Sequence, residues 1–184
     1  MKASIILSTY NRPQALLTVL EALKLQTIQD FEVCIADDGS TKDTQQIIEN
    51  FQQNSAFPIL HAWQDDRGFR AASARNNAVR MSSGDYLLFF DGDCIPRPNW
   101  IQQHLTLSEK HAFVAGNRVL LDETLSHAIE THRIPFTDLF GLNVLRHKEH
   151  INRLIPLLKI PLGSMRKLKP TSWAKVRTCN LRIF

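Results

Sequence analysis

The feature that most constrains the fold is an alternation of strand-length apolar runs with longer segments of helical period. Strands are expected at 3–8, 31–37, 58–64, 85–91 and 112–121. Helices are expected between them, at 13–26, 41–53, 71–83 and 98–110. This alternation is typical of repeated βαβ units and predicts an α/β fold: a mostly parallel sheet with helices on both faces.

The last third of the chain differs in pattern and in charge. Beyond about residue 122 the helical pieces are interrupted by Pro156, Pro161 and Gly163. Residues 1–143 carry 12 Lys and Arg against 17 Asp and Glu, whereas residues 144–184 carry 10 against one. We therefore expect a core over 1–121 and an appended, partly irregular, helical and basic region over 122–184.

The basic region predicts contact with an anionic partner, and the sequence leaves several open. A membrane surface, a phosphorylated substrate and nucleic acid all carry the required charge. A solvated basic segment, balanced by acidic residues elsewhere in the fold, is the alternative. Nucleic acid is the weakest of these hypotheses, because the rest of the chain is acidic and no recognition motif is present.

Cysteine usage and hydropathy bear on the compartment. The three cysteines, Cys34, Cys94 and Cys179, have no CxxC spacing, which favours a reducing compartment and makes a zinc site unexpected. The first residues lack the apolar stretch of a signal peptide. No run approaches the roughly 18 apolar residues of a membrane span. We expect a cytoplasmic protein.

Three expected strands end in polar, turn-forming clusters, at 8–13, 37–40 and 91–93. In an open parallel sheet, ligands bind beyond the carboxyl ends of the strands. The three clusters should therefore face one crevice.

The last of these clusters, Asp91-Gly92-Asp93, places two carboxylates directly after a buried strand. They repel each other unless a cation or hydrogen-bond donors neutralise them. Mg²⁺ or Mn²⁺ bridging substrate phosphates would meet that need, and a glycine between the acids lets a ligand approach closely. The alternative is a turn with two solvated aspartates. The Asp-Gly-Ser cluster could likewise be an ordinary turn in which Asp38 caps the next helix.

Taken together, the clusters carry a family resemblance. The segments "IILSTYNRPQAL", "VCIADDGSTKDT" and "DRGFRAASARNNAVRMSSGDYLLFFDGDCIPRPNWI" resemble family 2 glycosyltransferases, the inverting nucleotide-sugar transferases of GT-A (Rossmann-like) fold. The resemblance covers roughly residues 3–121. It implies a sugar-transfer enzyme rather than only a fold.

The resemblance also implies roles for individual residues on the nucleoside side. Ser8 and Tyr10 lie where the family lines the nucleobase pocket. Asp38 matches the acid that hydrogen-bonds the base, and Asp37 is its neighbour near the nucleoside. Arg75 matches a position that contacts the nucleotide. From the residues alone, Tyr10 could instead be a core aromatic and Arg75 a surface charge.

On the phosphate side, the resemblance places Asp91 nearer the ribose and sugar and Asp93 as the more direct ligand of the metal, Mn²⁺ or Mg²⁺. Arg67 and Arg70 lie in a glycine-containing loop that could contact phosphate or be solvated. Three further residues could reach the acceptor or be ordinary surface and strand-end positions: His104, Asn117 and Arg118.

The activity expected from the resemblance is inverting transfer from a UDP-sugar to a glycan or glycolipid acceptor. The setting would be bacterial-type surface polysaccharide or lipopolysaccharide synthesis. In related transferases the base is an acid that follows a segment resembling "TCNLRIF" (178–184). Asp122-Glu123 lies too early to match it, so we expect the general base to be missing from this chain, and 122–184 to be the start of an incomplete acceptor-side part. We expect the chain to bind a UDP-sugar with metal but to turn over poorly.

Two other functions remain open from the sequence. One is a truncated, non-catalytic nucleotide-sugar-binding remnant. The other is a nucleotidyltransferase, although "STYNRP" contains no glycine of a phosphate loop. If the acceptor is a membrane glycolipid, the basic region 144–184 would dock the protein peripherally on the inner face of the cell membrane.

Overall fold

The computed structural model describes residues 2–109, 113–114, 116–153 and 180–183. The described residues belong to two compact units, one within 1–114 and 178–184 and the other within 115–177.

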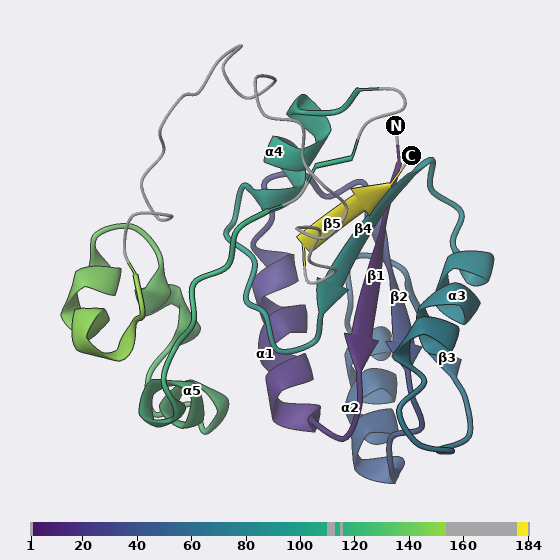
Figure 1. The fold of residues 1–184 in the computed structure, drawn as a ribbon, viewed down its shortest axis with the longest axis horizontal. Coiled ribbons are helices and arrows are strands. Elements are labelled where there is room, and N and C mark those ends of the chain that lie inside the picture. Colours follow the sequence, from purple (N-terminus) through teal and green to yellow (C-terminus); the bar gives the residue numbers. More distant parts are fainter. Residues whose placement is uncertain (1, 110–112, 115, 154–179, 184) are drawn as a thin grey trace. The chain divides into compact units, whose positions relative to one another are not determined.

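The first unit holds a five-stranded sheet in the order β3-β2-β1-β4-β5 (Figure 1). Its strands are β1 (Ala3–Thr9), β2 (Phe31–Asp37), β3 (Ile59–Trp63), β4 (Tyr86–Asp91) and β5 (Asn180–Ile183). Its helices are α1 (Pro13–Lys24), α2 (Lys42–Gln53), α3 (Ala71–Met81) and α4 (Trp100–Thr106). The first four strands are mutually parallel, and β5 pairs antiparallel with β4. The predicted α/β architecture is confirmed.

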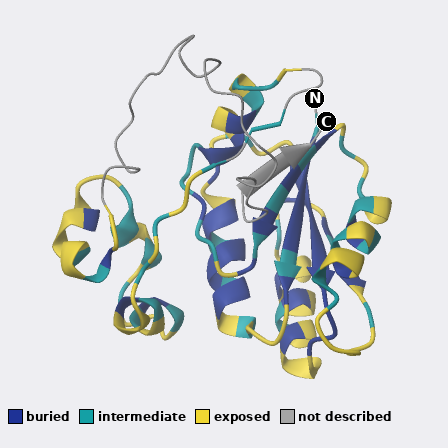
Figure 2. Cartoon of the chain, in the orientation of Figure 1, coloured by how far each residue is buried: buried dark blue, intermediate teal, exposed yellow. Residues whose placement is uncertain are grey.

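Each face of the sheet is covered by helices, which is why the strands are apolar on both sides. Side chains of α1, α2 and α4 pack on one face with Ile5, Val33 and Leu88. The small residues Ala74 and Ala78 bring α3 onto the other face. Figure 1 shows α3 on the opposite side of the sheet from α1, and Figure 2 shows the buried residues gathered between these layers.

A buried polar network fixes the amino ends of the strands, opposite the predicted crevice. The Glu32 carboxylate accepts hydrogen bonds from Lys2 Nζ (2.8 Å), Ser4 Oγ (2.7 Å), and the backbone N (2.5 Å) and Oγ (2.7 Å) of Ser83. Burial by itself raises the pKa of Glu32, but these donors outweigh it and lower the pKa to about 2. The network ties β1 and β2 to the segment that leads into β4.

The second unit contains α5 (Glu123–Glu130) and two 3₁₀ segments, η1 (Phe136–Leu139) and η2 (Asn143–His150). Asp122 caps α5 by accepting from Leu125 N (2.9 Å), and its other carboxylate oxygen lies 2.7 Å from His150 Nδ1. Because of these two interactions, the pKa of Asp122 lies below its ordinary value. Among the described residues, no helix is long and apolar enough to cross a membrane.

Two expected elements are wrong in the part that the structure describes. The strand expected at 112–121 is absent from 113–114 and 116–120; only Leu121 forms a bridge, to Ile151 in the second unit. Leu120 also hydrogen-bonds Asn152 rather than a sheet neighbour. The strand that pairs with the outer edge of β4 is instead β5. The helix expected over 98–110 is also shorter, because α4 ends at Thr106.

Candidate functional site

Three strand ends meet at one edge of the sheet, as the sequence predicts. In the pairing register Thr9 lies beside Asp37 and Ser8 lies beside Asp91. The backbone N of Asp38 donates to Thr9 O at 3.2 Å, which extends this alignment past the end of β2. The candidate residues of β1, β2 and β4 are therefore neighbours.

Arg75 joins two of these strand ends from α3. Its Nε donates to Ser8 Oγ at 2.7 Å, and its Nη2 lies 3.1 Å from Asp91 Oδ1. The Arg75 and Asp91 side chains are only 21% and 27% exposed, so this ion pair is partly shielded from water. The alternative of a solvated surface charge for Arg75 is wrong.

The turn after β4 is tightly fitted to β1. Gly92 N donates to Ser8 O at 2.7 Å, and a Cβ at Gly92 would lie 2.6 Å from that oxygen. Glycine is therefore required for Asp91 and Asp93 to flank this contact. Asp93 is half-exposed, and its Oδ2 lies 3.3 Å from Arg12 Nη1.

The ligand atoms of Asp91, Asp93 and Cys94 lie within 4.8 Å of one another. Carboxylate oxygens suit the hard divalent cations Mg²⁺ and Mn²⁺, and a half-exposed Asp93 leaves one side open to water and phosphate oxygens. The two aspartates fit the predicted metal. The neighbouring thiol of Cys94, a softer ligand, was not part of the prediction.

Asp37 is buried, and both of its carboxylate oxygens interact with neighbouring residues of the first unit. Its Oδ1 accepts from Ser40 N at 2.8 Å, and its Oδ2 lies 2.9 Å from His61 Nε2. Burial raises the pKa of Asp37, but the hydrogen bonds from His61 and Ser40 outweigh it, so the pKa lies below its ordinary value. In this arrangement Asp37 shapes the loop after β2.

Asp38 is buried beside it and faces a different set of donors. Its Oδ1 accepts from Gln64 Nε2 at 2.6 Å, and its Oδ2 accepts from the backbone N of Arg70 at 2.7 Å. It does not cap α2, whose N-cap residue is Thr41. The capping alternative for Asp38 is therefore wrong.

Tyr10 lies at the open side of the loop after β1. Its side chain is 49% exposed, which excludes the core-aromatic alternative. Its hydroxyl donates to Asp66 Oδ2 at 2.9 Å, and this interaction raises the pKa of the Tyr10 phenol. Gly39, with φ at +97°, packs so closely under Asp66 that a Cβ would lie 2.6 Å from its backbone. The loop after β3 thus lies over the turn that carries Asp37 and Asp38.

The remaining arginines of that loop have local partners. Arg67 pairs with Asp65 at 3.0 Å on the exposed side, and the Arg70 Nη2 donates to the carbonyl of Asp65. Phe69, between them, is 95% exposed.

The expected acceptor-side residues do not form a group within one unit. His104 is buried on α4, with its ring 5.2 Å from that of Trp100, so the expectation of a helix-surface histidine is wrong. Asn117 and Arg118 belong to the second unit, where the Arg118 carbonyl accepts from Arg153 Nη2 at 3.2 Å.

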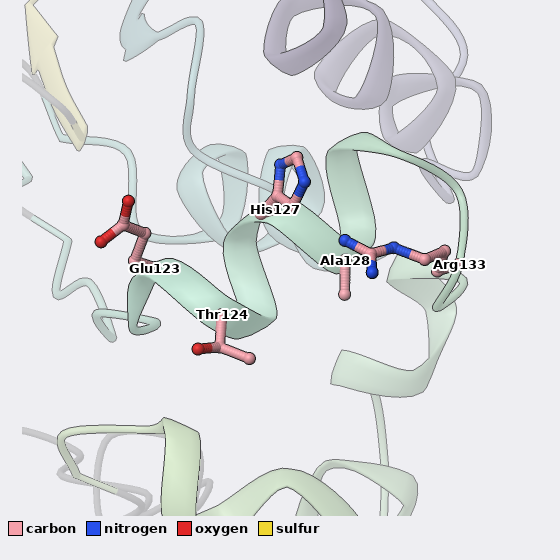
Figure 3. A pocket seen from close by; sticks show the side chains of 5 residues that line it. All are labelled: Glu123, Thr124, His127, Ala128 and Arg133. Atoms are coloured by element: carbon pink, nitrogen blue, oxygen red, sulfur yellow. The ribbon is translucent and has the colours of Figure 1, made fainter.

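An open pocket lies on α5 in the second unit (Figure 3). Its lining residues are Glu123, Thr124, His127, Ala128 and Arg133. None of them is among the residues predicted from the strand ends, and no donor-binding role follows from their arrangement.

With this geometry established, comparison with known proteins is decisive. The profile described as "Glycosyl transferase family 2" matches residues 4–166. The chain belongs to glycosyltransferase family 2.

Curated relatives of family 2 match over part of their length. A validoxylamine A glucosyltransferase from Streptomyces hygroscopicus subsp. jinggangensis is 36% identical over 120 residues, which is 64% of this chain and 27% of that protein. A chondroitin synthase from Escherichia coli is 36% identical over 105 residues, or 56% of this chain and 15% of that protein. The chain thus spans about a quarter or less of these two relatives.

Solved structures agree with the fold. S. aureus TarS 1–349 in complex with UDP-GlcNAc has a TM-score of 0.51 and 28% identity, covering 66% of this chain and 34% of that one. A mannosyltransferase from Pyrobaculum calidifontis, in complex with GDP-Man and Mn2+, has a TM-score of 0.54 at 21% identity, covering 63% and 35%. The second likeness supports the fold alone.

Several residues of the site were not singled out from the sequence. Arg12, His61, Gln64 and Asp66 all contact predicted residues. Gln64 and Asp66 come just after β3, at the same edge of the sheet, and that position was the signal available for them. Arg12 lies in the strand-end cluster at 8–13, so its position was a signal as well. His61 lies within β3, and the direction of its side chain is not contained in a one-dimensional pattern.

Proposed function

We propose that this chain supplies the donor-binding part of an inverting glycosyltransferase that moves a sugar from a UDP-sugar to a glycan or glycolipid acceptor. Family membership gives the reaction class. The proposal concerns the donor, the acceptor and the stereochemistry.

The observation that carries the proposal is the connection made by Arg75 between Ser8 and Asp91, 2.7 and 3.1 Å away. It places a guanidinium between the end of β1 and the first acid of the Asp-Gly-Asp turn. A planar, permanently charged group with several donors at that point is suited to diphosphate oxygens. We propose that Asp38, which directly follows β2, contacts the base.

The roles divide along the strand ends. We propose that Ser8, Tyr10 and Asp38 bind the nucleoside, with Asp37 holding the loop that presents Asp38. Arg75 and Asp91 would face the ribose, sugar and phosphates, and Asp93 with Asp91 would hold Mn²⁺ or Mg²⁺. When bound, such an ion takes up negative charge that develops on the leaving diphosphate.

Holding donor and acceptor in line would supply much of the remaining acceleration. Inversion also needs a group that deprotonates the acceptor hydroxyl. Among residues 2–109, 113–114, 116–153 and 180–183 we assign no such base.

Uridine as the nucleoside is supported by the 28% identical TarS structure, which contains UDP-GlcNAc. A glycan acceptor is supported by relatives named for chondroitin and hyaluronan synthesis, at 36% and 34% identity. Surface polysaccharide or lipopolysaccharide synthesis, at the inner face of a membrane, fits the basic region 144–184. Most of that region lies outside the described residues.

The test is a titration of the chain with UDP, UDP-sugars and GDP-mannose by calorimetry, with and without Mn²⁺. Asp93→Ala should lose the metal-dependent part of UDP binding while keeping the metal-independent part. Glu109→Ala, an acid outside the strand-end clusters, is the control. Absence of uridine nucleotide binding by the unaltered chain would overturn the proposal.

Acceptor-dependent release of UDP separates transfer from binding. Binding without release would favour the non-catalytic remnant over a complete transferase. The family match already argues against a nucleotidyltransferase.

A further inference from the structure

We infer that Gln64 is a positioning residue for nucleobase recognition: its side-chain amide sets the orientation of the Asp38 carboxylate. This inference rests on the proposed function, because it takes Asp38 to contact the base. Gln64 directly follows β3, and its backbone N donates to Asp37 O at 3.2 Å. This hydrogen bond holds the backbone of Gln64 at the carboxyl ends of the strands, independently of the contacts of its side chain.

The side-chain amide of Gln64 makes four hydrogen bonds, two through its NH₂ group and two through its oxygen. Nε2 donates to Asp38 Oδ1 at 2.6 Å and to Arg70 O at 3.3 Å. Oε1 accepts from Ser73 Oγ at 2.9 Å and from Asn77 Nδ2 at 3.2 Å. Ser73 and Asn77 are one turn apart on α3, so a single face of that helix holds the amide oxygen.

This arrangement determines which way the amide points. A carboxylate only accepts hydrogen bonds, so the end of Gln64 that meets Asp38 must be the NH₂ group. The two donors from α3 require the oxygen at the other end. The contact to Asp38 is therefore a charge-assisted hydrogen bond whose direction is set by α3.

Asp38 is held on its other side as well. Its Oδ2 accepts from the backbone N of Arg70 at 2.7 Å, so one donor reaches each carboxylate oxygen. Each oxygen keeps a further lone pair for a ligand donor. Because Asp38 is only 5% exposed, a misdirected carboxylate could not be compensated by water. The fixed carboxylate is suited to an imide N–H, which uracil has and cytosine lacks.

The experiment distinguishes recognition of the base from binding of the metal by measuring the affinities for uridine, UDP and Mn²⁺ individually. Gln64→Met keeps the length of the side chain and removes the amide. We expect it to weaken uridine and UDP binding by the same factor, about tenfold for one charge-assisted hydrogen bond, with Mn²⁺ affinity unchanged. A merely structural role would lower all three affinities together.

Gln64→Glu adds a pH readout. At pH 8 its carboxylate would face that of Asp38, so uridine should bind more weakly than to Gln64→Met. Repulsion by the Asp38 carboxylate should raise the pKa of the introduced carboxyl. At pH 5.5 a larger protonated fraction can then donate to Asp38, and affinity should partly recover relative to pH 8. The matched control is Gln52→Met, which removes an amide that donates to the backbone carbonyl of Ile59 at 3.0 Å.

If Gln64→Met does not fold, Asn77→Ala provides the same test by removing one donor to Oε1. It should weaken uridine binding two- to threefold. Uridine affinity equal to that of the unaltered chain in the folded variants would overturn the inference. If the unaltered chain binds no uridine nucleotide, the proposed function itself fails, so the two failures are distinguishable.

Discussion

The guanidinium of Arg75 lies 3.1 Å from the carboxylate of Asp91 while also donating to Ser8 at 2.7 Å, so one side chain of α3 joins the ends of β1 and β4. Its position is set by small residues. Ala74 and Ala78 are buried against the sheet, which brings α3 close enough for Arg75 to reach the strand ends.

Replacement of Arg75 should therefore damage donor binding more than stability. We expect Arg75→Met to weaken UDP binding roughly 10- to 100-fold, because charge-assisted hydrogen bonds are lost. Arg75→Lys should recover only part of this loss, since one ammonium group lacks the fork that reaches both partners. Calorimetric titration with UDP checks both variants.

Lys24→Met serves as the control for the loss of a positive charge, since Lys24 pairs with Glu21 at the far end of α1. Equal UDP affinity in Arg75→Met and Lys24→Met would contradict the prediction.

Arg12→Ala should strengthen binding of Mn²⁺ rather than weaken it. Arg12 lies 3.3 Å from Asp93 in an exposed ion pair, and a cation that binds Asp93 has to displace it. Because such pairs contribute little, we expect a gain of about two- to fivefold at low salt. The gain should shrink at 0.5 M NaCl, where exposed charges are screened. Electron paramagnetic resonance of free Mn²⁺ measures the affinity. Weaker Mn²⁺ binding by Arg12→Ala than by the unaltered chain would contradict the prediction.

Gly92→Ala should destabilise the fold and the site together. The added Cβ would lie 2.6 Å from Ser8 O, so the turn has to move away from β1. We expect a loss of about 1–3 kcal/mol in the free energy of unfolding, as for other overpacked positions. Urea denaturation measures this loss. Gly68→Ala, where φ is +82° but no atom lies within 4 Å, should keep more UDP affinity than Gly92→Ala.

Glu32 should make the fold sensitive to acid. Its folded pKa of about 2 lies below its ordinary value of 4.5, so its contribution is fully present above pH 4.5 and disappears as the pH falls towards 2. That contribution is about 3 kcal/mol at most. Glu32→Gln should therefore be less stable than the unaltered chain at pH 7, with the difference narrowing by pH 3. Denaturant unfolding at both values provides the check; a constant difference would exclude this role.

The sequence predicts the first unit well because its signals are local. The period of Leu16, Val19 and Leu20 identifies α1, and the apolar run before Asp91 identifies β4. The strand-end rule then places Ser8, Asp37 and Asp91 together, which the pairing register bears out.

What the sequence does not reveal depends on distant partners. The apolar residues of 112–121 predict a strand, yet Leu121 pairs with Ile151 while β4 pairs with β5. Which segment pairs with which strand depends on competition between segments far apart in the chain. His104 is different, because its spacing from Trp100 and Ile101 on one face of α4 could have indicated burial.

The antiparallel pairing of β4 with β5 also bears on synthesis by the ribosome. Phe90 of β4 is translated about ninety residues before its register partner Asn180, a delay of several seconds at ordinary elongation rates. Throughout that interval one side of β4 lacks its hydrogen-bonding neighbour in the nascent chain, and an open strand edge is a template for wrong pairing. We therefore expect this chain to depend on chaperones most in the interval between the synthesis of β4 and that of β5.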